Sequence, residues 1–109
     1  MLAELLKNKG FTTKIKKFYT QNRKIILDII LFGSVVRGKT EAKDIDILLL
    51  FKDKEDLEKN YELRKLLEGE YKNIEIISKN YQTLIRKNFP PKEGILGDGY
   101  SLLRKEFLA

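Results

Sequence analysis

Residues 31–47 read LFGSVVRGKTEAKDIDI, and this stretch decides the fold of the 109-residue chain. It opens at the end of one apolar run, breaks at Gly33-Ser34, and closes on Asp44-Ile45-Asp46 where a second apolar run begins. A short run of bulky residues that is apolar at every position is typical of a strand covered on both faces. We therefore expect a strand over residues 28–32, a tight turn leading into a short helix over 34–38, and a second strand over 44–51.

Two carboxylates share one face of the second expected strand. Because side chains alternate along a strand, Asp44 and Asp46 lie on one face, and Ile45 and Ile47 lie on the other. Neighbouring carboxylates repel each other, and a bound divalent cation relieves the repulsion. Hard oxygen ligands of this kind favour Mg²⁺. An Asp-x-Asp pair is common by itself, so the turn that precedes it adds the specificity.

That turn has the features of an anion site. Gly33 allows a sharp change of backbone direction, and the N–H groups of a following helical turn attract a negatively charged group. Ser34 adds a hydroxyl donor. Phosphoryl or nucleotidyl transfer requires such a phosphate cradle beside a metal-binding carboxylate pair.

Composition excludes several alternatives. The chain has no Cys and no His, which removes disulfide scaffolds, thiol nucleophiles, His general bases and His- or Cys-ligated metals. Any chemistry must therefore be carried by carboxylates. Residues 1–43 hold ten Lys or Arg and three acids, whereas the rest of the chain is nearly neutral, for a net charge of +6. This basic half suits a phosphate-rich ligand or partner, and a solvated Lys-rich face is the alternative.

The remaining pattern predicts helices between the strands. We expect a helix from Leu2 to Lys9 ended by Gly10, a helix from Thr12 or Thr13 to about Lys24, and a strand over 73–78. Asp53 is expected to cap a helix whose buried stripe is Leu57, Tyr61, Leu63, Leu66 and Leu67. Tyr81, Leu84 and Ile85 mark another helix, which Pro90 and Pro91 end. In the tail from Gly94, Gly97-Asp98-Gly99 is a turn signal, and Tyr100 to Leu108 is expected to form a last helix or an edge strand. The prediction is one domain over residues 1–109 of the α/β (α+β) class, with helices packed on a short mixed sheet.

Taken together, the motifs resemble a known family. Leu31 to Gly38 followed by Asp44 to Ile47 looks like the signature of the minimal nucleotidyltransferases in the DNA polymerase β superfamily. The resemblance implies that Gly33 and Ser34 contact a nucleoside triphosphate and that Asp44 and Asp46 hold Mg²⁺ or Mn²⁺. It also implies that Arg37 neutralises phosphate or braces the turn. The third carboxylate of the family falls on Glu75, where the usual residue is Asp; a plain surface Glu is the alternative.

The resemblance further implies a function. A member of this family transfers a nucleoside monophosphate, here AMP from ATP, to an acceptor hydroxyl, and minimal members are often paired with a HEPN-domain protein as the antitoxin-like half. Two alternatives stay open: a catalytically weak binding protein that keeps the fold, and a module that modifies or binds RNA. Asp28 is expected to start its strand or pair with a Lys rather than join the site. No membrane segment or signal peptide is apparent, so a cytoplasmic protein is expected.

Overall fold

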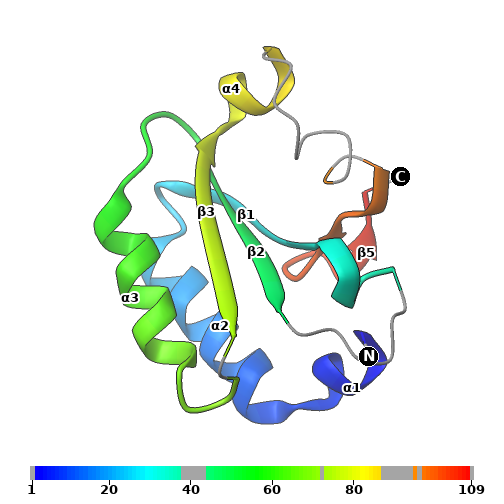
Figure 1. The fold of residues 1–109 in the computed structure, drawn as a ribbon. Helices are drawn as coiled ribbons and strands as arrows, with labels where there is room; N and C mark the ends of the chain where they lie inside the picture. Colours follow the sequence, from blue (N-terminus) through cyan, green and yellow to red (C-terminus); the bar gives the residue numbers. More distant parts are fainter. Residues whose placement is uncertain (1, 38–43, 72, 87–94, 96, 109) are drawn as a thin grey trace.

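A mixed five-stranded sheet forms the centre of the protein. The structure is a computed structural model that describes residues 2–37, 44–71, 73–86, 95 and 97–108. In these residues the strand order is β3-β2-β1-β4-β5 (Figure 1). The strands are β1 (Ile26–Phe32), β2 (Ile45–Phe51), β3 (Ile74–Asn80), β4 (Tyr100–Ser101) and β5 (Glu106–Phe107). β2 and β3 run parallel and the other pairs run antiparallel, which confirms the expected α+β class with a short mixed sheet.

Helices cover the two faces of the sheet unequally. α1 (Leu2–Lys7), α2 (Lys9–Asn22) and α3 (Leu57–Leu67) supply Leu5, Phe11, Ile15, Phe18, Leu63 and Leu67 to the larger core cluster. The smaller cluster, on the opposite face, receives Leu84 from α4 (Tyr81–Arg86) together with Ile95. In β2, Ile47 and Leu49 belong to the first cluster, and Leu48 and Leu50 belong to the second. The predicted two-sided burial of the central strands is thus confirmed.

The break between the first two helices lies at Asn8, two residues before the expected break at Gly10. The Asn8 side chain accepts a hydrogen bond from the Phe11 N–H at 3.1 Å, so Asn8 caps α2 and Gly10 lies inside its first turn. The predictions that Gly10 ends the first helix and that Thr12 or Thr13 begins the second were wrong. Asn8 accepts in place of those threonines, and Gly10 has a packing role: a Cβ there would lie 2.5 Å from the Glu70 Oε1.

α3 presents a different face to the sheet from the one that the apolar residues predicted. Its cap is Asp56, which accepts from the Glu58 N–H, and not Asp53. Leu57 and Tyr61, expected in the buried stripe, are 73% and 60% exposed.

The physical reason lies in the edge of the sheet. β3 is an edge strand, and its backbone carbonyls need donors. Asn60 donates to the Ile76 carbonyl at 2.8 Å, and Arg64 donates to the Ile74 carbonyl at 2.7 Å. These bonds turn the 60/64 side of the helix inward beside Leu63 and Leu67.

In the described part of the tail, residues 95, 97 and 98 are helical, and two short strands follow them. β4 pairs with β1 through Leu31 and Tyr100, and β5 returns beside β4 as a short hairpin. Of the two possibilities left open for the tail, the edge strand is the correct one. Pro90 and Pro91, expected to end the fourth helix, lie outside the described residues. No helix among the described residues has the length and apolar character of a segment that crosses a bilayer.

Candidate functional site

The acidic residues predicted from the sequence meet at one end of the three long strands. Asp46 is paired with Phe32 of β1 on one side and with Glu75 of β3 on the other. Directly paired residues of parallel strands point to the same face, and the Glu75 carboxyl group is close enough to raise the pKa of Asp46. Asp44 immediately precedes β2 and is close enough to act electrostatically on Asp46. Glu75 is therefore placed as expected, across the sheet from Asp46 and on its face.

The electrostatics of Asp46 reflect this crowding. Burial raises the pKa of the Asp46 carboxyl above its ordinary value, and the negative charges of Glu75 and Asp44 raise it further. Arg37 opposes the shift, because its positive charge favours the ionised form. Burial and the neighbouring negative charges thus favour the uncharged form of Asp46, and a bound cation would favour its ionised form.

Gly33 passes directly over this carboxylate. Its φ is +78°, a left-handed conformation that side chains rarely adopt. A Cβ built on Gly33 would overlap with the Asp46 Oδ2 and lie 3.4 Å from the Asp46 Cγ. Glycine is required here both by the backbone angle and by the contact. The turn and the carboxylate, separate features in the sequence, form one unit.

The turn after β1 is shorter than predicted. Residues Gly33–Val35 form a single 3-10 turn, η1, instead of the start of a regular helix within the described residues. The N–H groups of Val36 and Arg37 both donate to the Gly33 carbonyl, at 3.1 and 3.2 Å. Donors for an anion would come from the beginning of the turn, where Ser34 is partly exposed.

Arg37 forms an ion pair that the sequence did not indicate. Its Nε lies 3.3 Å from the Asp98 Oδ2, and both side chains are about half exposed. The Gly97-Asp98-Gly99 stretch was recognised only as a turn signal. Nothing in the sequence showed that this turn would lie beside η1. Lys39 and Lys43 lie outside the described residues.

The donor set fits a hard divalent cation in its chemistry. Asp44, Asp46 and Glu75 offer only oxygen ligands, and the pKa of Asp46 is raised first by burial and then by the negative charges of Glu75 and Asp44, a repulsion that a cation would relieve. In the described part of the chain, no three acidic side chains stand close enough together to hold one ion as they are. The three carboxylates are neighbours and do not yet form a complete ligand shell.

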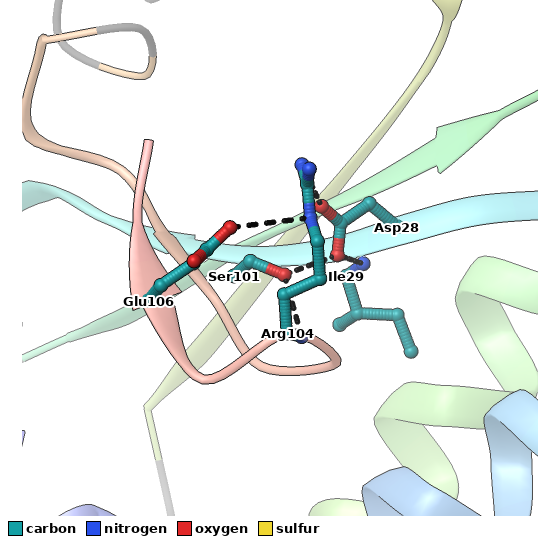
Figure 2. Close-up of polar contacts among 5 residues, drawn as sticks. All are labelled: Asp28, Ile29, Ser101, Arg104 and Glu106. Atoms are coloured by element: carbon teal, nitrogen blue, oxygen red, sulfur yellow. Dashed lines mark hydrogen bonds and ion pairs between the residues drawn. The ribbon is translucent and has the colours of Figure 1, made fainter. Parts of the chain in front are cut away.

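Asp28 is buried elsewhere on the sheet and does not join this group. It is paired with Leu50 of β2. Leu50 lies four residues from Asp46 on the same strand, which is roughly 13 Å at the usual strand rise. Figure 2 shows its carboxylate between Ser101, whose hydroxyl donates at 2.8 Å, and the Arg104 guanidinium at 3.3 Å. Asp28 stays outside the site as predicted, but its partner is an Arg from the tail and not a Lys.

The chain matches a known family over most of its length. Residues 13–95, which include all six predicted site residues, match the family described as polymerase beta, nucleotidyltransferase. A comparison with curated proteins finds no match.

Similar solved structures are toxin–antitoxin complexes. One, a toxin–antitoxin crystallised with AMP-PNP, has a chain that is 25% identical with a TM-score of 0.60; the alignment covers 84% of this chain and 71% of that one. A mutant of the MntA–HpeT toxin–antitoxin is 23% identical with the same TM-score and coverage, which shows the fold alone. A tri-AMPylated HEPN toxin from Shewanella oneidensis in complex with its MNT antitoxin gives 25% identity and a TM-score of 0.54, over 84% of this chain and 67% of that one.

Proposed function

Because the chain belongs to the polymerase β nucleotidyltransferase family, we propose that it transfers AMP from ATP to a hydroxyl group of a HEPN-domain partner protein. The observation that carries the proposal is the unit formed by Gly33 over Asp46 with Glu75 beside it. Similarity to a chain solved with AMP-PNP supports a nucleotide substrate. Similarity to a complex that contains an AMPylated HEPN toxin and its MNT antitoxin supports both the acceptor and an antitoxin role.

The proposed roles follow from position. The start of η1, with Ser34, would bind the phosphates, and Arg37 would neutralise part of their charge. Asp44 and Asp46 would hold Mg²⁺ or Mn²⁺, with Glu75 as the third ligand. When bound, the metal would offset the negative charge that builds up on the phosphates.

The reaction balances without any further reagent. The acceptor oxygen bonds to the α-phosphorus, the bond from that phosphorus to the bridging oxygen of the β-phosphate breaks, and pyrophosphate leaves. The acceptor proton passes to a carboxylate, for which Glu75 is placed at the exposed edge of the group. Arg37 sits on the side where the leaving group's charge would develop if the phosphates lie along η1.

Labelled ATP provides the test. The protein is incubated with α-³²P-ATP, Mg²⁺ and a candidate HEPN-domain partner, and covalent label on the partner is counted. The variant Asp44→Asn/Asp46→Asn should transfer no AMP. The control Asp53→Asn/Glu68→Gln, which removes two exposed carboxylates elsewhere, should transfer like wild type.

Glu75 receives its own variant in the same assay. Glu75→Gln should slow transfer by about 10²–10⁴-fold, the usual contribution of a positioned acid or base, while ATP affinity measured by calorimetry changes little. Full activity of Glu75→Gln would make Glu75 a surface residue. Transfer to the partner that survives the loss of Asp44 and Asp46 would refute the proposed site, and ATP-independent neutralisation of the partner would favour a binding protein.

A further inference from the structure

The structure contains a second surface feature, which the proposed function does not use. Two hollows are lined in part by α2 and by the β4–β5 hairpin, two elements whose places in the fold Figure 1 shows. The first, of about 690 Å³, is lined on α2 by Thr12, Lys16 and Tyr19, and on the hairpin by Leu102, Leu103 and Lys105. We call the two hollows together the α2–hairpin groove.

The hollows adjoin each other. Tyr19 and Leu103 line both, so the second hollow, of about 910 Å³, continues from the first around the end of β1. Along α2 alone the lining residues run from Thr12 to Thr20, which is about 12 Å, or two helical turns, at the rise of an α-helix. An elongated groove of this kind suits a segment of polypeptide better than a compact metabolite.

The groove is apolar at its floor and positive at its rim. Its aliphatic lining includes Leu6 and Ile15 of the helices and Leu102 and Leu103 of the hairpin. The two charged residues that line the first hollow are Lys16 and Lys105.

The second hollow adds Lys52 and Arg104 to the same rim. Its carboxylate, Asp28, is buried and already bonded to Ser101 and Arg104, so it offers little negative charge to a ligand. Glu106 lies 4.0 Å from the Arg104 Nε and only partly offsets that cation. Leu27 and Tyr81, both more than 40% exposed, extend the apolar surface at this end.

From this charge complementarity we propose that the α2–hairpin groove binds an acidic amphipathic helix of a partner protein. Apolar side chains on one face of such a helix would lie on the floor, and Glu or Asp residues at its margins would meet Lys16, Lys52 and Lys105. The first hollow is lined by α1, α2 and the hairpin, and the second by residues of α2, β1, β2, α4 and the hairpin together with Lys52; neither includes η1 or the three carboxylates of the candidate site. Binding there leaves those carboxylates accessible, and the inference does not depend on nucleotidyl transfer.

A defined peptide tests the proposal. The probe is a fluorescein-labelled 18-residue peptide with Leu at helical i, i+3, i+4 spacing and Glu elsewhere, and the reference peptide has Lys in place of each Glu. Fluorescence anisotropy should show binding of the acidic peptide and none of the basic one. Lys16→Glu/Lys52→Glu, with one reversal in each hollow, should weaken binding by at least about tenfold because two attractive charge pairs become repulsive.

The matched control has the same net charge. Lys17 and Lys65 are exposed lysines of α2 and α3 that do not line either hollow, so Lys17→Glu/Lys65→Glu should change the affinity by less than about twofold. Circular dichroism establishes that both variants fold. Hydrogen exchange in the wild-type protein should show peptide-dependent protection in residues 12–20 and 100–105.

Three results would overturn the proposal. The first is that the acidic peptide does not bind. The second is that both double variants weaken its binding equally, which would mean unspecific charge attraction. The third is that a single-stranded RNA of 18 nucleotides displaces the peptide and binds with the same sensitivity to Lys16 and Lys52. The last result would assign the groove to nucleic acid. None of these measurements contains ATP or metal, so failure of the peptide to bind leaves the proposed transferase function standing, and failure of AMP transfer leaves the groove standing.

Discussion

The contact between Gly33 and Asp46 leads to a sharp prediction about stability. Gly33→Ala adds one methyl group at a residue with φ of +78°, which costs about 1–2 kcal/mol for an L side chain. The new Cβ also overlaps with the Asp46 Oδ2, and displacing that carboxylate costs a further 1–3 kcal/mol or so, as in other overpacked sites. The loss of backbone freedom in the unfolded chain returns about 0.4–1 kcal/mol. We therefore expect a net destabilisation of roughly 1–4 kcal/mol.

The two costs can be separated with a double-mutant cycle. Asp46→Ala removes the carboxylate and leaves the Asp46 Cβ, which lies 3.6 Å from the added methyl group, an ordinary contact. In that background Gly33→Ala should cost only the backbone strain, about 1 kcal/mol after the gain from the unfolded state. The coupling energy between the two positions is then about 1–3 kcal/mol.

Urea unfolding followed by circular dichroism provides the measurement, with Gly97→Ala as the matched control. No atom lies within 4 Å of a Cβ at Gly97, so that variant should be neutral or slightly stabilising. The reasoning is refuted if Gly33→Ala is as well tolerated as Gly97→Ala. It is also refuted if the cost of Gly33→Ala is the same with and without the Asp46 carboxylate, because the contact would then contribute nothing.

Further predictions concern two acids, the partly buried Asp46 and the buried Asp28. Because burial and Glu75 raise the pKa of Asp46, the native state holds its proton more tightly than the unfolded chain does, and stability falls as the pH rises above about 3.8, the ordinary pKa, through the raised value. In metal-free buffer Asp46→Asn should therefore unfold at a higher temperature than wild type at pH 7, with a smaller gain at pH 3; equal gains at both pH values would contradict this. Asp28→Asn should destabilise the protein by about 1–3 kcal/mol in urea, because it weakens a buried bond to Ser101 and leaves Arg104 without its carboxylate. Arg104→Ala should cost less, about 1 kcal/mol or below, since that side chain is 63% exposed; the reverse order would show that the arginine, and not the buried acid, stabilises the hairpin.

Much of the candidate site was predictable because it is local. Alternation along a strand follows from backbone geometry, so Asp44, Ile45 and Asp46 could be assigned to faces without a structure. The break at Gly33-Ser34 likewise predicted where the first central strand ends. The beginnings of the strands were less exact, since β1 begins at Ile26 and not at Asp28, and β2 at Ile45 and not at Asp44. A tight turn leading into a short helix was expected after β1, and the described residues contain the single 3-10 turn η1.

The sequence by itself determined the order of the central elements, the class of the fold and the identity of the acids, because these depend on spacing between near neighbours. Tertiary structure decided which distant groups meet. The register of β2 and β3 brings Glu75 to Asp46. The first part of the tail brings Asp98 to Arg37, and the hairpin brings Arg104 to Asp28. The face of α3 was also decided at this level, because the open carbonyls of an edge strand drew polar side chains inward and left Leu57 and Tyr61 exposed. Hydrophobic periodicity reports how much apolar surface an element has to bury; it contains no information on which backbone groups elsewhere in the fold still need a hydrogen-bond donor.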